Sequence, residues 1–451
     1  MSCSLIRRIC LMSKIGVVSL GCSKNQIDCE HMLCLLDEAG YELTVELNNV
    51  DAVLINTCGF IGDARDEAYE YIKEAVALKE EGSVGKIVVT GCLAELLKDS
   101  LKDEFPQIDA LVGCGSYMDI ADVFKAVFAG EYAKVFARPD EAPLECGRII
   151  TTAPYTAFIK IAEGCSNCCA YCVIPRLRGK LRSRDMDEVV NEAEALAETG
   201  VRELIVVAQD TGSYGVDRSG KSELPELLRR LCAIEKLEWV RVHYLYPDKI
   251  SDELCDVIAN EDKIVKYLDI PIQHINDRVL KAMNRRDTGA EIKALLTKLR
   301  EKIPGVVIRT SLIVGFPGET DEEFEELCDF LKEYKIERAG VFAYSREEGT
   351  KAAAMDGQID EDVKQHRAEL VGALQARVMD EYNEKMLGKT LRVLVEGFDR
   401  YSECYFGRSF ADSPDIDGKV FFRGKKGIRP GEFCDVVIDG ELDGDLLGEA
   451  E

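Results

Sequence analysis

The sequence predicts an α/β protein in three parts: an N-terminal parallel α/β domain, a partial (β/α)6 barrel and a C-terminal small β-barrel. The chain has 451 residues, the length of about three domains at ~150 residues each. Hydrophobic residues make up 46% and charged residues 31%, a globular balance. Apolar runs alternate with helical patterns until the last part of the chain, where the pattern changes to period two. We place the domains at 13–130, 151–387 and 388–451.

The first domain is predicted from short apolar runs separated by helical patterns. Strands are expected at 15–20, 52–56, 86–90 and 110–112, with helices at 28–39 and 63–80. This rhythm is typical of a parallel sheet covered by helices. Residues 1–11 are interpreted as an extension, so that Met1 and Met12 are both candidate start positions, and the Pro-containing segment 138–150 as a linker.

The second and third domains differ in the spacing of their apolar residues. Strands are expected at 156–161, 203–208, 239–245, 267–270, 306–314 and 338–343, with helices at 186–199, 222–234, 250–260, 275–283, 288–302 and 321–335. Six β/α units fall short of eight, which indicates an incomplete barrel. Thr320 and Glu323 have the spacing of a capping box. After a helix at 360–387, strands at 391–395, 404–408, 419–422 and 432–438 predict a small β-barrel or sandwich.

Composition limits the function classes. The chain has 57 basic and 83 acidic residues, and all three parts are acidic, with net charges of −11 (1–150), −10 (151–387) and −5 (388–451). This argues against general phosphate-backbone binding and favours a basic partner, or simply solubility. No apolar run approaches the ~18 residues of a membrane helix, and Lys14 interrupts the short apolar stretch near the N-terminus. We expect a cytoplasmic protein with no membrane partner.

The 18 cysteines and only four histidines point to thiolate metal ligation in a reducing compartment. Cys165, Cys169 and Cys172 have C-x3-C-x2-C spacing just after the first strand of the partial barrel. Three thiolates can hold three irons of a 4Fe-4S cubane and leave the fourth iron open for an outside ligand. The alternatives are buried free thiols or a zinc half-site using Cys168, which would need a second pair. We interpret Cys168 as a bystander.

A second constellation is dispersed along the first domain. Cys22, Cys58 and Cys92 each follow a predicted strand, and the carboxyl ends of parallel strands open on one edge. Adjacent glycines would let the backbone approach a bulky inorganic core. We expect an auxiliary 4Fe-4S cluster there, the alternative being that these cysteines are small core residues. Cys114 follows a fourth strand and could be a further ligand, although we expect that it is not.

The C-x3-C-x2-C loop resembles that of radical S-adenosylmethionine (SAM) enzymes, and the chain from about 14 to 450 resembles the methylthiotransferases among them. That family has a three-cysteine N-terminal domain, a radical SAM partial barrel and a C-terminal TRAM β-domain. Residues 56–60 and 91–93 match its cysteine signatures. Residues 18–25, 207–211, 267–274 and 407–418 are similar to the RimO-type branch, which modifies an aspartate of a small-subunit ribosomal protein. Ser23 stands where the family usually has proline. The alternative branch is a tRNA (adenosine) methylthiotransferase.

The resemblance implies the chemistry. SAM would bind the open iron of the Cys165/Cys169/Cys172 cluster, and reduction by a low-potential electron donor would yield a radical that takes a hydrogen from the β-carbon of the target aspartate. Sulfur would come through the Cys22/Cys58/Cys92 cluster. The substrate would be a basic small-subunit ribosomal protein, of the small-subunit protein twelve type, free or in the ribosomal subunit.

Three acidic residues in the C-terminal domain, Asp412, Asp415 and Asp417, lie in one stretch. Such a loop would repel phosphate and attract a Lys/Arg-rich protein, so that direct nucleic-acid binding is not expected to dominate. The alternative is a solvated acidic surface.

Two non-enzymatic hypotheses are also considered: a cluster scaffold for electron transfer, and a ribosome-binding assembly factor.

Other polar residues are candidates for supporting roles. Gln209, Asp210, Gln273 and Arg309 are expected near carboxyl ends of barrel strands, as SAM or substrate contacts. His274 is interpreted as a structural hydrogen-bonding residue rather than a catalytic one. A basic run follows the cluster loop; it would neutralise the cluster or hold the SAM carboxylate, or it is a solvated face or substrate entrance. This run comprises Arg176, Arg178, Lys180, Arg182 and Arg184.

Overall fold

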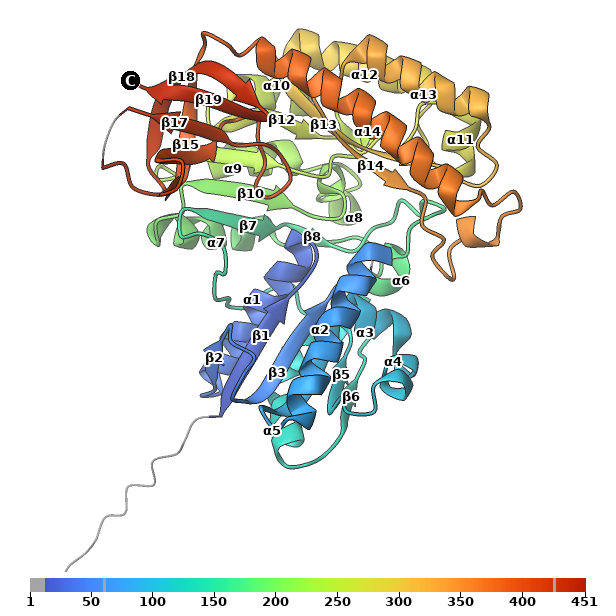
Figure 1. The fold of residues 1–451 in the computed structure, drawn as a ribbon, viewed down its shortest axis with the longest axis vertical. Coiled ribbons are helices and arrows are strands. Elements are labelled where there is room, and N and C mark those ends of the chain that lie inside the picture. Colours follow the sequence, from blue (N-terminus) through green and yellow to red (C-terminus); the bar gives the residue numbers. More distant parts are fainter. Residues whose placement is uncertain (1–12, 60–61, 425–426) are drawn as a thin grey trace, which may run out of the picture. The chain divides into compact units, whose positions relative to one another are not determined.

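The computed structural model describes residues 13–59, 62–424 and 427–451 (Figure 1). The chain forms two compact units. Unit 1 contains the chain up to Thr151 together with Ile174–Lys180, and unit 2 contains Thr152–Val173 and Leu181–Glu451. The N-terminal extension and both candidate start positions, Met1 and Met12, lie outside the described residues. No helix in the described part of the chain is long and apolar enough to cross a membrane.

Unit 1 is built on one six-stranded sheet with all neighbouring strands parallel, in the order β2-β1-β3-β4-β5-β6 (Figure 1). Its strands are β1 Lys14–Ser19, β2 Glu42–Thr44, β3 Val50–Thr57, β4 Val84–Gly91, β5 Ala110–Val112 and β6 Ala133–Val135. The chain runs from β1 to one side and then returns to build the rest of the sheet on the other. The strand order therefore reverses between β1 and β3, the topological position at which open α/β sheets bind ligands.

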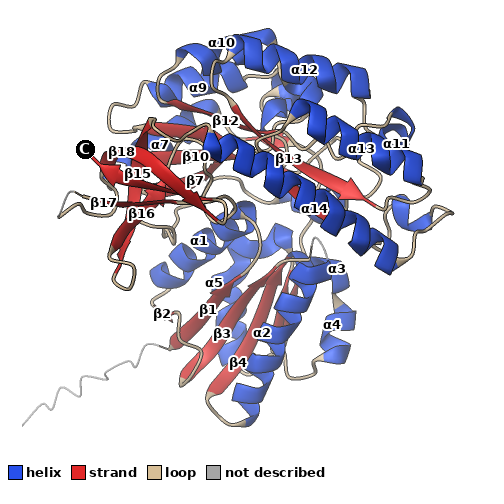
Figure 2. Ribbon diagram, turned by 45° about the horizontal axis from the view of Figure 1, so that its top comes forward, coloured by secondary structure: helices blue, strands red, loops and turns tan. Residues whose placement is uncertain are grey.

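Helices cover both faces of this sheet (Figure 2). Along β3, Ala52 and Leu54 pack into one core, whereas Val53 and Ile55 pack into the other. This alternation explains why a strand buried on both faces reads as a continuous apolar run. The first core contains α1 Ser23–Glu38 and α5 Ile120–Phe128; the second contains α2 Gly62–Glu80, α3 Cys92–Leu97 and α4 Asp99–Glu104. Two short 3-10 turns, η1 Cys114–Asp119 and η2 Pro139–Glu141, follow β5 and β6.

The segment 138–150, predicted as a linker, belongs to unit 1, and its second half is hydrogen-bonded to α1. Ile149 donates its N–H to the carbonyl of Glu30, and Thr151 donates its N–H and hydroxyl to Glu30 Oε1 at 2.7 and 2.8 Å. His31 Nδ1 lies 3.0 Å from the carbonyl oxygen of Gly147. A buried carboxylate needs such donors, so the segment is held within unit 1.

Unit 2 begins with a six-stranded parallel sheet in the order β7-β10-β11-β12-β13-β14, with β7 and β14 at its two edges. Consecutive strands are neighbours, as in a barrel that stops at six β/α units. The strands are β7 Thr156–Lys160, β10 Glu203–Val207, β11 Trp239–Val242, β12 Ile264–Asp269, β13 Val307–Val314 and β14 Arg338–Ala343; β8 Ala162–Glu163 and β9 Arg182–Ser183 form a separate antiparallel pair.

Helices follow these strands in order, as the periodicity predicts. They are α7 Met186–Glu198, α8 Val216–Ser219, α9 Leu224–Cys232, α10 Asp252–Asn260, α11 Asp277–Ala282, α12 Gly289–Lys302 and α13 Asp321–Tyr334, with 3-10 turns η3 Thr211–Ser213, η4 Pro247–Lys249 and η5 Ala352–Ala354. The capping box is confirmed: Thr320 accepts from the N–H of Glu323, and the Glu323 side chain accepts from the N–H of Thr320.

A long helix, α14 Glu361–Glu384, leads to a closed barrel in the order β15-β16-β17-β19-β18. Its strands are β15 Thr390–Asp399, β16 Cys404–Arg408, β17 Val420–Arg423, β18 Phe433–Leu442 and β19 Asp445–Ala450. Of the two predicted forms, barrel or sandwich, the barrel is confirmed. The predicted fold class is confirmed in all three parts.

The structure adds five strands, β2, β6, β8, β9 and β19, that the pattern did not predict. β2 and β6 have three residues each at the edges of the sheet, too few for an alternating pattern to show. Helix α1 starts at Ser23, five residues before the predicted start, because its first turn is polar and faces the carboxyl edge of the sheet. Its Lys24 and Asn25 are nevertheless buried.

Candidate functional site

In unit 1, the three dispersed cysteines lie at the carboxyl ends of three adjacent strands. Cys22 follows β1 and is the N-cap of α1, Cys58 follows β3, and Cys92 begins α3 directly after β4. Since β1, β3 and β4 are parallel neighbours, their carboxyl ends share one edge. The edge includes the reversal point between β1 and β3, where α/β sheets bind ligands.

Glycines bring these three loops into close contact. A Cβ atom at Gly21 would lie 2.6 Å from Cβ of Cys58 and 2.8 Å from its Sγ. At Gly59 it would lie 2.9 Å from the backbone nitrogen of Leu93, which follows Cys92. Gly21 also has φ +87, a left-handed conformation that favours glycine. Any side chain would separate the loops, so the glycines keep the cysteine-bearing turns together.

The thiol of Cys92 has two polar neighbours. Cys114 Sγ donates to it at 3.9 Å, and Nη2 of Arg178 lies 3.4 Å from it. The hydrogen bond from Cys114 and the positive charge of Arg178 lower the pKa of Cys92 despite its burial. A cysteine with a lowered pKa favours the thiolate, the form that binds metal.

These residues fit an iron–sulfur cluster in donor type and in space. Thiols from three turns lie at one edge of the sheet, glycines let these turns pack closely, and a buried cation lies against one of the thiols. In the described ranges, no three His, Cys, Asp or Glu side chains are arranged to hold a single metal ion. A cubane binds its cysteines through different iron atoms, so its ligands need not converge on one point.

In unit 2, Cys165, Cys169 and Cys172 share the loop that follows β8. The loop is fixed by backbone contacts: Ala170 donates to the carbonyl of Met283 at 2.8 Å and accepts from Ala352 at 2.9 Å. Nη1 of Arg285 lies 3.9 Å from Cys169 Sγ, and Arg285 is buried. Three thiols on one anchored loop beside a buried cation fit a cluster with an open iron.

Cys168 is exposed, with φ +55, and its carbonyl accepts from Asn284 at 2.8 Å. Its thiol is therefore on the outside of the loop. Its predicted role as a bystander stays a prediction.

A buried carboxylate supports the start of the cluster loop. Glu163 accepts from Lys160 Nζ at 2.7 Å, from Gln209 Nε2 at 2.6 Å and from the N–H of Gly164 at 3.2 Å. Gln209 follows β10, so this carboxylate connects the loop to the neighbouring strand. The side-chain oxygen Oε1 of Gln209 is buried without a hydrogen-bond partner among the described residues.

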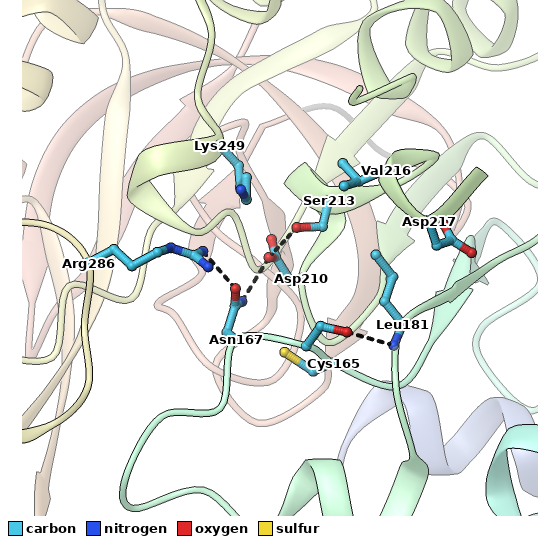
Figure 3. Close-up of a pocket in the computed structure, with 10 residues that line it drawn as sticks. Cys165, Asn167, Leu181, Asp210, Ser213, Val216, Asp217, Lys249 and Arg286 are labelled. Carbon is cyan, nitrogen blue, oxygen red and sulfur yellow. Dashed lines mark hydrogen bonds between the residues drawn. The ribbon is translucent and has the colours of Figure 1, made fainter. Parts of the chain in front are cut away.

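Beside Cys165 there is a cavity of ≈ 190 Å³. It is lined by Cys165, Ser166, Asn167, Leu181, Asp210, Ser213, Val216, Asp217, Lys249 and Arg286 (Figure 3). Asp210 Oδ2 accepts from Asn167 at 2.8 Å and from Ser213 at 2.6 Å, and Arg286 donates to Asn167 at 2.7 Å. Asp210 Oδ1 is buried with no partner in the described chain. The cavity thus offers both carboxylate and cationic groups to a zwitterionic ligand.

Gln273 and Arg309, the other two predicted SAM or substrate contacts, lie elsewhere in unit 2. Gln273 is buried with φ +70, and its backbone bridges to β13 through the carbonyl of Ser311 and the N–H of Ile313. Arg309 is only the third residue of β13 and pairs with Asp269, the last residue of β12, at 3.0 Å. Neither residue lines the cavity beside Cys165. The expected position of Arg309 near the end of its own strand is wrong, because β13 continues to Val314.

The basic run after the cluster loop does not act as one surface. Arg176 and Lys180 are exposed, whereas Arg178 and Arg184 are buried. Arg178 belongs to α6 Ile174–Arg178, which is part of unit 1, where it contacts Cys92. Within unit 1, Arg178 therefore contacts a cysteine of the dispersed triad, a role that the sequence pattern did not indicate. In unit 2, the buried cation beside the Cys165/Cys169/Cys172 loop is Arg285, which the sequence analysis did not select.

The prediction that the acidic loop of the C-terminal domain attracts a basic partner is also corrected. Asp412 is buried, accepts from Ser409 at 2.6 Å and pairs with Arg338 at 3.1 Å. Asp417 accepts from the hydroxyl of Tyr267 at 2.7 Å. Only Asp415 of the three is exposed. Because Asp412 and Asp417 bind the partial barrel, they are not available to a basic partner.

Three family models match the chain: the Radical SAM superfamily over residues 159–331, the Uncharacterized protein family UPF0004 over residues 14–113, and the TRAM domain over residues 387–450. The ribosomal protein uS12 methylthiotransferase RimO of Caldanaerobacter subterraneus subsp. tengcongensis is 47% identical over 439 residues, covering 97% of this chain and 100% of that protein. The protein of the same name from Pelotomaculum thermopropionicum is 48% identical over 440 residues, covering 97% and 99%.

Solved structures share the fold. The radical S-adenosylmethionine methyltransferase TsrM from Kitasatospora setae, with tryptophan and a SAM analogue bound, has a TM-score of 0.54 at 16% identity, covering 73% of this chain and 72% of that one. The same enzyme with cobalamin and a [4Fe-4S] cluster has a TM-score of 0.55 at 15% identity, covering 76% and 74%. Because the RimO relatives match over nearly their whole length, the sequence resemblance is confirmed: this chain belongs to the family of ribosomal protein uS12 methylthiotransferases, the RimO-type radical SAM enzymes.

Proposed function

We propose that this protein transfers a methylthio group to the β-carbon of an aspartate in ribosomal protein uS12, and that its two cysteine triads hold two 4Fe-4S clusters with different tasks. The observation that carries this assignment is the placement of three thiols at the carboxyl edge of each of two parallel sheets. The triads are Cys22, Cys58 and Cys92 in unit 1, and Cys165, Cys169 and Cys172 in unit 2. When bound, the clusters supply the electron that cleaves SAM and the sulfur that is transferred.

The residues around Cys165 are assigned to SAM. Asn167, Asp210 and Ser213 form a hydrogen-bonded row along the cavity, with Arg286 at one end (Figure 3). An amino group would find an acceptor in the unpartnered Oδ1 of Asp210, and a carboxylate would find cations in Arg286 and Lys249. Gln209 is assigned a positioning role rather than a SAM contact, because it donates to Glu163, which in turn holds the start of the cysteine loop.

Arg285 is assigned to the Cys169 thiolate. Its side chain is buried, donates to the carbonyl of Pro271 at 2.8 Å, and lies over the ring of Tyr246, 3.8 Å from its centre. These contacts fix the guanidinium beside a thiolate ligand, where a positive charge offsets part of the negative charge of the cluster. His274 is assigned a structural role, because its Nδ1 accepts from the N–H of Asn276 within the same turn.

The substrate assignment rests on the named relatives, which act on ribosomal protein uS12, and on the charge of the chain. A net charge of −26 favours association with a basic protein over a phosphate backbone. Since Asp412 is buried against Arg338 and Asp417 is hydrogen-bonded to Tyr267, this attraction must come from other acidic residues of the surface. A tRNA substrate is therefore not favoured.

The test is an anaerobic reaction of the reconstituted protein with SAM, dithionite and sulfide. Purified uS12, small ribosomal subunits and bulk tRNA are offered in parallel, and mass spectrometry detects an added methylthio group. We expect modification of an aspartate in uS12, free or in the subunit, and unmodified tRNA. Modification of tRNA alone would contradict the substrate assignment. SAM cleavage without any modified product would contradict the assignment of the unit-1 triad to sulfur transfer.

A further inference from the structure

Arg178 connects all three cysteine-bearing turns of unit 1. Its Nη2 lies 3.4 Å from Cys92 Sγ and 3.2 Å from Oδ1 of Asn25. Asn25 in turn donates its Nδ2 to the carbonyls of Leu20 and Thr57 at 2.7 and 3.3 Å. Those carbonyls belong to the turns that carry Cys22 and Cys58. One guanidinium therefore touches one thiol directly and reaches the other two turns through a single amide.

The environment of this guanidinium is buried and charged. Arg178 is 3% exposed, and its Nη1 donates to Asp28 Oδ2 at 2.5 Å. Asp28 lies on α1, one turn after Asn25, and is also buried. Burying an arginine is costly unless its charge is compensated. The Asp28 carboxylate and the Asn25 amide accept from this guanidinium, which also directs an N–H at a sulfur atom. Lysine could not make these contacts together, because only the planar guanidinium has N–H groups in a fixed fork.

A thiolate-ligated cluster is anionic, and its reduction adds another negative charge. A fixed cation with an N–H directed at a ligand sulfur stabilises the reduced state more than the oxidised one, and so raises the reduction potential. Asp28 acts in the opposite sense, because its negative charge offsets part of that of Arg178. The two residues would therefore shift the potential in opposite directions.

We propose that Arg178 is a positioning residue for the sulfur-supplying cluster: it holds the turns of Cys22, Cys58 and Cys92 together and raises the reduction potential of that cluster. This inference rests on the proposed function, because it requires a cluster on the unit-1 triad. It also assigns a role to α6, which follows the SAM-cluster cysteines in the sequence but folds into unit 1. The same short segment thus links the loop of one cluster to the support of the other.

The experiment uses the full chain with Cys165, Cys169 and Cys172 all replaced by alanine, so that only the unit-1 triad can hold a cluster. Into this background we place Arg178→Gln, Arg178→Lys, Asp28→Asn and, as the matched control, Arg176→Gln, which removes an exposed arginine from the same helix. Iron per chain, the midpoint potential from an EPR-monitored redox titration, and the rate of iron loss to a chelator are measured. Circular dichroism checks that each variant is folded.

We expect Arg178→Gln to shift the potential to a more negative value and to speed iron loss about tenfold or more, the usual effect of losing a residue that supports a metal ligand. Arg178→Lys should shift the potential to a more negative value by less than Arg178→Gln does. It should nevertheless lose iron faster than the background chain. Asp28→Asn should shift the potential to a more positive value, and Arg176→Gln should change neither quantity. A residue that only stabilised the fold would not produce shifts of opposite sign.

An unchanged potential in both Arg178→Gln and Asp28→Asn would overturn the inference. If Arg178→Gln retains no iron, Asp28→Asn decides: a positive shift supports the proposal, and no shift contradicts it. A background chain without iron would instead contradict the proposed function, and with it the inference. The two failures are therefore distinguishable by the iron content of the background chain.

Discussion

Arg408 of β16 donates two hydrogen bonds to the carboxylate of Glu203 in β10, at 2.6 and 3.1 Å, and both side chains are fully buried. Arg241 of β11 donates a third to the same carboxylate at 3.1 Å. The C-terminal barrel is therefore joined to the six-stranded sheet by a buried group of three charges. Trp239 and Phe433 pack edge to face beside it, with ring centres 4.8 Å apart. The TRAM-type barrel is thus a structural part of unit 2.

Replacing Glu203 with glutamine should strongly destabilise unit 2, because Arg408 and Arg241 would keep their positive charges in a buried site. Breaking a buried ion pair from one side costs about 3–5 kcal/mol. The matched control is Glu238→Gln, which breaks partly exposed pairs with Arg202 and Arg392 and should cost at most about 1 kcal/mol. Urea unfolding of both variants measures the difference, and equal losses would contradict the account.

The same carboxylate gives a pH dependence. Burial alone would raise the pKa of Glu203, but the guanidinium groups of Arg408 and Arg241 lower it to about 2 from its usual 4.5. Its stabilising contribution is complete above about pH 4.5 and is lost as the pH falls towards 2, about 3 kcal/mol in all. The unfolding free energy of the wild-type chain should therefore fall more steeply over this range than that of Glu203→Gln. Parallel curves would show that the pKa of Glu203 is not lowered.

His274 provides a second pH test. Burial lowers its pKa to about 4 from 6.5, so it is neutral in the folded chain at neutral pH. Its contribution to stability is complete above about pH 6.5 and is lost as the pH falls towards 4. His274→Asn, which keeps an acceptor for the N–H of Asn276, should reduce this loss while SAM cleavage continues. Loss of SAM cleavage in a folded His274→Asn chain would show that this histidine takes part in the reaction.

Asp210→Asn should weaken SAM binding at least tenfold without loss of iron. The change removes the negative charge of Asp210 from the cavity beside Cys165, while the amide can still contact Asn167 and Ser213. Asp187→Asn is the control, since Asp187 pairs with Arg230 on an exposed surface of α7. Equilibrium binding of SAM and iron content are measured on the same samples. Unchanged binding would remove Asp210 from the SAM site.

The strands that carry the cysteines could be predicted from the sequence because each reads as an apolar run; β3 and β4 are buried over most of their length, and β1 is partly buried. Their carboxyl ends had to share an edge once the sheet was parallel, so Cys22, Cys58 and Cys92 could be grouped without any distance. β19 was missed because Gly448 and Glu449 interrupt its alternation. The predicted support residues were less accurate, because side-chain partners far apart in the sequence leave no local pattern.

Arg178 shows this limit most clearly. It lies six residues after Cys172 in the sequence, whereas its partners in unit 1 are Asp28, Asn25 and Cys92, which no local pattern indicates. The role of Asp412 and Asp417 could not be predicted for the same reason. A charged loop is expected to be exposed unless its partners elsewhere in the chain are known. In both cases, the partner that decides the role is more than 70 residues away.

The central claim, that each triad holds its own cluster, is tested most directly by iron content and SAM cleavage in three full-length chains. After anaerobic reconstitution, we predict about eight irons in the wild-type chain. About four are expected in the chain with Cys22, Cys58 and Cys92 replaced by alanine, and about four in the chain with Cys165, Cys169 and Cys172 replaced. The first variant should still cleave SAM, and the second should not. About four irons in the wild-type chain, or an unchanged iron content after loss of the unit-1 triad, would contradict the two-cluster account.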